Sequence, residues 1–297
     1  MSEHYHTHPL GEKSLKWSIT LNLLISLSQG VGAVISGSYA LLADALHNLT
    51  DVFSLAISYI AVKLGSKRNT LKRTFGYQRA EMMAAFFNSL TLILLGGFLI
   101  FESIFRWKKE PIISYEWVIW LAVASILINA VSALLLHRDA KASINIKSSY
   151  LHLFTDMLTS IAVFVGGLMM KYFGWFWVDS LLTILIAVFL LIQSFGIFYR
   201  SLRSLLMFTP KGIDLEQIVK DINTVSGIKD MHHVHVWEMN DHSIMLEAHI
   251  DLIKDFRISE FEKILLEIEA LLLDNYGISH VNIQPEIFKS DSKQIIA

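Results

Sequence analysis

Six long apolar segments in the first two thirds of the chain constrain what it can fold into. They cover residues 17–35, 39–64, 80–105, 117–136, 150–172 and 177–198. A helix needs about 20 largely apolar residues to cross the hydrocarbon core of a bilayer. Backbone groups in lipid must be hydrogen-bonded within the segment that carries them, so single spans of this kind are helical. We therefore predict an α-helical membrane protein with six transmembrane helices.

Composition separates these segments from the last third of the chain. Of the 297 residues, 53% are hydrophobic and 18% are charged, whereas a soluble domain carries about 25% charged residues. The deficit lies in the first 210 residues. We predict a cytosolic N-terminal tail at 1–16, a transmembrane domain at 17–210, a cytosolic C-terminal domain at 211–290 and a tail at 291–297.

Basic residues in the loops predict the orientation in the membrane. Lys and Arg gather between residues 63 and 79 and between 138 and 149, on the same side of the six spans. The opposite side carries one basic cluster, in residues 106–109. The positive-inside bias therefore predicts that both termini are cytoplasmic.

The C-terminal region has the pattern of a small soluble domain. Residues 214–225 and 259–276 have helical periodicity, and residues 229–239, 243–252 and 279–287 alternate as strands do. The order α-β-β-α-β predicts a small α+β, ferredoxin-like domain with both helices on one face of an open sheet. A domain of about 80 residues has a marginal core and benefits from a partner.

Two predicted membrane helices carry ionisable residues that lipid disfavours. Burying a charge at the bilayer centre costs at least about 2.5–3.5 kcal/mol, so such residues indicate function. His47 and Asp51 are four residues apart, as are His152 and Asp156, so each pair shares one helix face. Asp44 lies one turn before His47 and fits either an access path or a hydrogen-bond network.

Two imidazoles and two carboxylates around one point suit a tetrahedral zinc ion. The chain has no cysteine, so any metal site depends on nitrogen and oxygen ligands. Cadmium, cobalt, manganese and ferrous iron remain alternatives, because ligand type alone selects weakly among these metals. The alternative is a purely structural role, in which both pairs only hydrogen-bond to neighbouring helices.

The same residues lie in motifs that resemble a known family. Residues 38–54 (SYALLADALHNLTDVFS), 75–81 (FGYQRAE), 152–156 (HLFTD) and 235–237 (HVW) are similar to the motifs of the cation diffusion facilitators, CzcD-like and ZnT-like zinc transporters. The resemblance implies a homodimer that exchanges cytoplasmic metal for protons. It also implies that His47, Asp51, His152 and Asp156 form the transport site. The short loops of this chain resemble those of family members in a prokaryotic inner membrane.

The resemblance further implies a metal site in the cytosolic domain. Transferred by motif position, its ligands are His232, His249, His280 and Glu286. The alternative interpretation is that these histidines support a dimer interface. The N-terminal histidines, His4, His6 and His8, fit a solvated tail better than a metal site.

We therefore predict a metal transporter, most simply a zinc/proton antiporter that exports zinc from the cytoplasm. The alternatives are a membrane-anchored metal sensor, a passive cation channel or an intramembrane metalloenzyme. A channel needs a continuous polar stripe, and an enzyme needs a nucleophile or a His-Glu-x-x-His motif, neither of which accompanies the cluster. A net charge of -2 gives no basic surface for nucleic acid.

Overall fold

The computed structural model describes residues 9–65, 69–107, 112–137, 144–240, 243–287, 289–290 and 292–296. The N-terminal histidines of the predicted tail lie outside these residues. The chain divides into two compact units, one of residues 1–59 and 87–198 and the other of residues 60–86 and 199–297.

Six long helices account for the first two thirds of the chain. They are α1 (Pro9–Ser36), α2 (Tyr39–Gly65), α3 (Ala80–Arg106), α4 (Tyr115–His137), α5 (Ile144–Phe173) and α6 (Trp177–Leu205). Each predicted apolar segment lies within one of them, which confirms the helical membrane fold. Among the described residues, four helices (α3 to α6) are long and apolar enough to cross a bilayer, and α1 has a shorter apolar part, Thr20–Ser36.

Large apolar side chains point outward along these helices. Leu94 on α3, Trp120 on α4 and Ile192 on α6 are 65%, 72% and 71% exposed. Apolar surface on this scale is unfavourable in water and favourable against hydrocarbon. These helices therefore present a lipid-facing exterior around a core that includes buried polar side chains.

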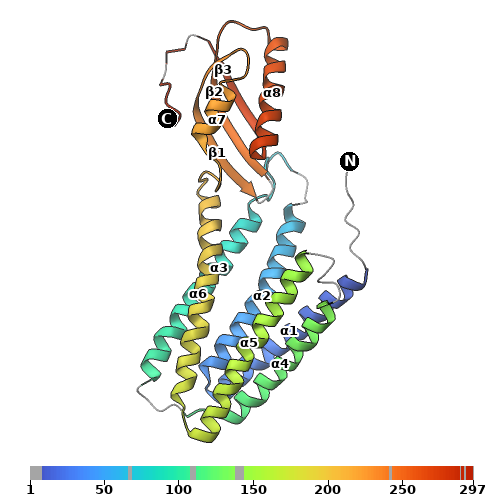
Figure 1. Ribbon diagram of the computed structural model, residues 1–297, viewed down its shortest axis with the longest axis vertical. Helices are drawn as coiled ribbons and strands as arrows, with labels where there is room; N and C mark the ends of the chain where they lie inside the picture. The colour runs from blue at the N-terminus through green and yellow to red at the C-terminus, as the bar shows by residue number, and fades with distance from the viewer. Residues whose placement is uncertain are drawn as a thin grey trace. The chain divides into compact units, whose positions relative to one another are not determined.

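Small residues let the helices approach closely. Figure 1 shows α4 running beside α1 and α5. A Cβ atom added to Gly32 on α1 would lie 1.9 Å from Leu121 Cδ1 on α4, and one on Gly167 of α5 would lie 2.8 Å from Ile119 Cγ1. Membrane helices depend on this kind of packing, since hydrophobic burial between them gains little over contact with lipid.

The turn between α1 and α2 is held by residues from other helices. Gly37 has a φ of 71°, a conformation that glycine adopts without strain. Its carbonyl oxygen accepts a hydrogen bond from Arg106 Nη1 at 2.9 Å. The carboxylate of Asp179, in the first turn of α6, accepts from Ser38 Oγ at 2.5 Å and from the Tyr39 N–H at 3.0 Å. Asp179 thus caps the N-terminus of α2, where a negative charge is favourable.

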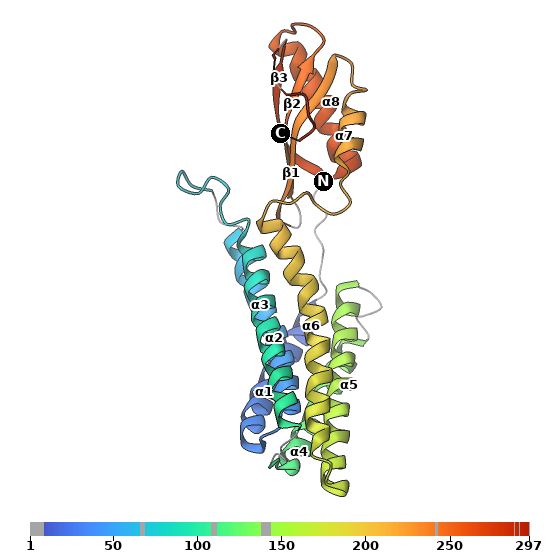
Figure 2. The ribbon, with the colours of Figure 1, turned by 90° about the vertical axis from the view of Figure 1, so that its left-hand side faces the viewer.

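The C-terminal domain has the predicted element order. It consists of α7 (Leu215–Ile222), β1 (Ile228–Asn240), β2 (Ser243–Leu252), α8 (Ile258–Tyr276) and β3 (Ile278–Glu286). The sheet order is β1-β2-β3, with β1 antiparallel and β3 parallel to β2. Figure 2 shows both helices on the same face of the sheet. An apolar core that includes Ile218, Leu246 and Ile268 lies between the helices and the sheet.

Candidate metal centres

The structure brings the four predicted intramembrane residues together. His47 and Asp51 lie one turn apart on α2, and His152 and Asp156 lie one turn apart on α5. His47 Nε2 is 3.3 Å from Asp156 Oδ1, and His152 Nε2 is 3.0 Å from Asp51 Oδ2 and 3.7 Å from Asp156 Oδ2. One ligand atom each of His47, Asp51 and Asp156 lies within 4.8 Å of the others, and His152 Nε2 approaches both carboxylates.

These separations match the dimensions of a tetrahedral metal site. With bonds of about 2.0–2.1 Å, neighbouring ligand atoms around zinc lie about 3.3–3.5 Å apart. The three Nε2–oxygen distances, 3.0, 3.3 and 3.7 Å, bracket that value. His47 Nδ1 also lies 3.7 Å from Asp51 Oδ2. Because His47 faces the two carboxylates with different nitrogen atoms, a cation held by all four side chains would require an adjustment of the imidazole rings.

Burial around the ring is uneven. The side chains of His47 and Asp156 are 3% and 2% exposed, whereas those of Asp51 and His152 are 35% and 42% exposed. The Phe189 ring of α6 lies edge-on to the His47 imidazole, with ring centroids 6.1 Å apart. One side of the ring is therefore closed by protein, and the side of Asp51 and His152 is accessible.

Asp44 belongs to a separate hydrogen-bond network. Its Oδ2 accepts from Gln29 Nε2 at 2.5 Å and from Ser160 Oγ at 3.2 Å. Ser160 in turn hydrogen-bonds to Ser125 at 2.8 Å, and Asn48 donates to Gln29 at 3.3 Å. This network links α1, α2, α4 and α5, so of the two predicted roles for Asp44 the geometry favours the hydrogen-bond network.

A second group of potential ligands lies in the C-terminal domain. His232 on β1 pairs directly with His249 on β2, and their ring centroids are 5.6 Å apart. Glu286, at the end of β3, places Oε1 3.0 Å from His249 Nδ1 and Oε2 3.4 Å from His232 Nε2. Burial lowers the pKa of the His249 imidazole below its ordinary value, which favours the neutral form that a metal requires.

His280, the fourth predicted ligand in this domain, is not part of this group. The strand register places it opposite Met245, whereas Gln284 lies opposite His249. Four residues along a strand span about 13 Å, so the exposed imidazole of His280 lies well away from the cluster. The motif position suggested His280 as a ligand, but its strand register keeps it away from His232, His249 and Glu286.

The sequence reasoning missed three charged residues at this cluster. Lys293 Nζ lies 3.0 Å from Asp251 Oδ1, 3.2 Å from His232 Nε2 and 3.5 Å from Glu286 Oε2. Lys289 Nζ contacts Glu286 Oε1. Alternation on β2 could have suggested Asp251, two residues after His249 on the same face. Nothing in the pattern of the last residues indicated that the lysines return to the sheet.

Two family models match nearly the whole chain. The model described as "Cation efflux transmembrane domain" matches residues 15–206, and the model described as "Cation efflux protein, cytoplasmic domain" matches residues 210–288.

Curated relatives match over a similar length. The chain is 34% identical to the cation efflux system protein CzcD of Alcaligenes sp., over 96% of this chain and 90% of that protein. It is 32% identical to a cadmium, cobalt and zinc/H(+)-K(+) antiporter of Bacillus subtilis, over 95% and 91% of the two chains. It is 30% identical to the zinc transporter ZitB of Pectobacterium atrosepticum, over 97% and 89%.

Proposed function

Because the chain belongs to the cation efflux family, whose transmembrane model matches residues 15–206, we propose that it exports zinc from the cytoplasm in exchange for protons. The protein is a multi-pass membrane protein that carries out divalent metal cation efflux, which is transport and not enzymatic catalysis. We propose in particular that the metal is zinc and that the counter-ion is the proton, and we assign the residues that bind them.

The observation that carries the proposal is the ring of His47, Asp51, His152 and Asp156. Four groups that lipid disfavours converge from two helices, at separations suited to a tetrahedral cation. We assign these residues as the ligands of the transported zinc. The named substrates of the relatives, zinc in one case and cadmium, cobalt and zinc in another, agree with a nitrogen and oxygen donor set.

Proton exchange follows from the chemistry of the ligands. A metal binds neutral imidazole and ionised carboxylate, so metal binding releases protons and protonation weakens metal binding. An ordinary imidazole titrates at about pH 6.5, close to cellular pH. When the site faces the cytoplasm, zinc displaces protons; when it faces a more acidic exterior, protons displace zinc. Joint movement of α2 and α5, which carry all four ligands, would switch the access.

The C-terminal cluster is proposed as a second, cytosolic metal site, with His232, His249 and Glu286 as its ligands. In the described part of the chain, these three residues and the trio His47, Asp51 and Asp156 are the two sets whose ligand atoms lie within 4.8 Å of one another. We further propose a homodimer in the inner membrane, with both termini in the cytoplasm, on the strength of the cytoplasmic-domain match and the loop charges.

Proteoliposomes with a zinc-sensitive dye inside test the function. Zinc uptake by the purified protein should accelerate several-fold when the lumen is made acidic, and protons should leave the lumen as zinc enters. Collapse of the pH gradient with a protonophore should remove the acceleration. A zinc uptake rate that is independent of the pH gradient would contradict proton exchange. The absence of any zinc flux would favour a membrane-anchored metal sensor.

A further inference from the structure

The end of the chain is bound to the sheet of the C-terminal domain. We define the C-terminal tail as residues 289–290 and 292–296. The Gln294 carbonyl oxygen accepts from the His233 N–H at 3.1 Å, and the Ile295 carbonyl oxygen accepts from the Val234 N–H at 2.7 Å. The tail thus pairs with β1 through two backbone hydrogen bonds.

A bulge in β1 makes this pairing possible. The pairing of β1 with β2 shifts register between His232 and His235, and His233 has a φ of 54°. A bulge leaves backbone groups outside the ladder and bends the strand. Here the N–H groups of His233 and Val234 bond to the tail instead of β2. A left-handed conformation at a residue other than glycine is uncommon and is maintained by its surroundings.

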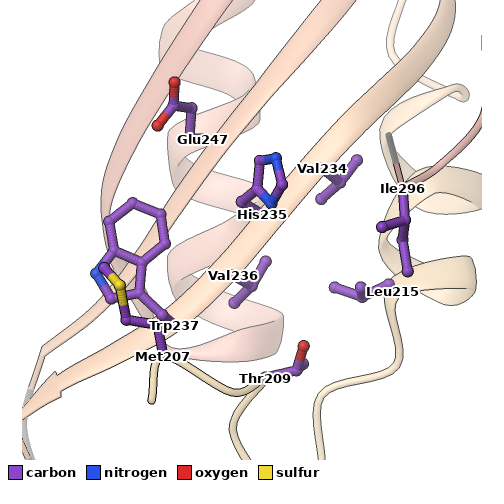
Figure 3. A pocket seen from close by; sticks show the side chains of 9 residues that line it. All are labelled: Met207, Thr209, Leu215, Val234, His235, Val236, Trp237, Glu247 and Ile296. Atoms are coloured by element: carbon purple, nitrogen blue, oxygen red, sulfur yellow. The ribbon is translucent and has the colours of Figure 1, made fainter. Parts of the chain in front are cut away.

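Ile295 packs against the apolar core of the domain, and Ile296, the last described residue and 61% exposed, lies beside a pocket. Ile296 lines it together with Leu215, Val234 and Val236. Figure 3 shows the Ile296 side chain beside Leu215 and Val234. The packing of Ile295 and the two backbone hydrogen bonds hold the end of the tail against the domain.

Just before these anchors in the chain, the tail places two ammonium groups on the proposed metal ligands. Lys293 Nζ contacts His232 Nε2 and Glu286 Oε2, and Lys289 Nζ contacts Glu286 Oε1. These are the same atoms that a metal would need. An ammonium group and a metal ion cannot share one lone pair. The lysine ammonium groups and a metal ion therefore compete for these atoms.

The charges of the two occupants also match. The Glu286 side chain is 2% exposed, and a buried carboxylate is costly without a positive partner. Lys289 and Lys293 together carry the charge of one divalent cation. Replacing both ammonium groups with a metal ion therefore leaves the net charge around Glu286 and Asp251 unchanged.

We propose that the C-terminal tail is a tethered competitor that closes the cytosolic cluster until a divalent metal displaces it. The inference rests on the cytosolic site proposed above and adds its regulation. Metal binding expels Lys293 and Lys289 and frees the tail from β1. Binding of cytosolic metal to the domain thereby releases the C-terminal tail.

Zinc affinity provides the first test. The full-length protein in detergent, with Asp51→Ala and Asp156→Ala to silence the membrane site, is titrated with zinc against a chromophoric chelator. Lys289→Gln together with Lys293→Gln should tighten zinc binding about tenfold, as expected if the tail is docked about nine tenths of the time. Lys220→Gln together with Lys263→Gln, two exposed lysines of the same domain, is the matched control.

Release of the tail provides the second test. The chain has no cysteine, so Gln294→Cys in the same background allows a single nitroxide label. Its electron paramagnetic resonance spectrum should change from immobile to mobile on addition of zinc. The Lys289→Gln and Lys293→Gln changes should make the label mobile without zinc.

Two results would overturn the inference in different ways. If His232→Ala abolishes zinc binding but the lysine changes leave affinity within twofold, or the label stays immobile at saturating zinc, the site stands and the competing tail is wrong. If His232→Ala leaves zinc binding unaltered, the cytosolic site itself is wrong, and the tail proposal falls with it.

Discussion

At the scale of single residues, His47 is the proposed ligand most directly tied to metal choice. It contributes one of two imidazoles to the intramembrane ring, and nitrogen ligands suit zinc, whereas carboxylate oxygens suit manganese. His47→Asp should therefore lower the ratio of zinc to manganese flux, by roughly tenfold for a preference change of about 1.4 kcal/mol. Paired uptake assays in proteoliposomes measure the ratio.

The exposed His280, outside both clusters, is the matched control for that change. His280→Asp should leave the ratio unchanged. Equal zinc preference in His47→Asp and the parent protein would show that the imidazole of His47 does not set selectivity.

Asp179 is the other residue whose charge has a defined structural task. Asp179→Asn keeps the size of the side chain but removes the negative charge at the N-terminus of α2. We expect a loss of about 1 kcal/mol of stability and a lower Tm in detergent, followed by intrinsic fluorescence. Asp274→Asn, on the exposed face of α8, should not lower Tm; equal Tm values for the two variants would contradict the capping role.

At the scale of elements, the contact of α4 with α5 depends on a missing side chain. Gly167→Val would push atoms into Ile119 and Val118 of α4, and overpacking of this kind costs about 1–3 kcal/mol. Gly97 on α3 has no atom within 4 Å of an added Cβ, so Gly97→Val serves as the control. Thermal unfolding in detergent should rank Gly167→Val below Gly97→Val. The reverse order would contradict the packing.

Helices α7 and α8 are tied by one hydrogen bond whose strength depends on pH. Tyr276 Oη donates to Asp221 Oδ2 at 2.6 Å. Burial and then this bond raise the pKa of Tyr276 from 10.0 to about 12. The folded state thus retains the proton more strongly than the unfolded state, so this stabilisation is complete below about pH 10 and declines as pH rises toward 12.

Tyr276→Phe should reduce the loss of stability between pH 10 and 12. Chemical denaturation of the full-length protein in detergent, at a series of pH values, measures this. An identical pH dependence in the parent protein and the Phe variant would rule out the Tyr276 contribution.

Most elements could be predicted because their signals are local. Apolar length predicted α1 to α6, and alternation predicted β1 and β2. The approach of α2 and α5 at Asp51 and Asp156 could also be predicted, because charged residues are unusual in apolar membrane helices.

The features that could not be predicted depend on contacts between distant segments. Lys293 reaches His232 only because a bulge in β1 bonds to the tail. Asp179 caps a helix that begins 140 residues earlier, at Tyr39. His280 fails to reach the cluster because of its register with Met245. Neither composition nor periodicity contains these pairings.

At the scale of the whole molecule, we propose that two clusters of similar chemistry have different tasks. The intramembrane ring has its proposed ligands on α2 and α5, so movement of these two helices would change access to it. The cytosolic cluster draws its ligands from three strands of one sheet, a rigid setting better suited to sensing a metal than to passing it on. Transport should therefore depend on Asp51 and Asp156 before any other carboxylate.

The most direct measurement is the initial rate of zinc uptake into proteoliposomes with an acidic lumen. It compares the parent protein with Asp51→Asn, Asp156→Asn and the surface control Asp274→Asn, at equal amounts of folded protein. We expect uptake at the level of empty vesicles for the two intramembrane variants and parental uptake for Asp274→Asn. Parental rates in Asp51→Asn and Asp156→Asn would contradict the account, because zinc would then cross without its proposed ligands.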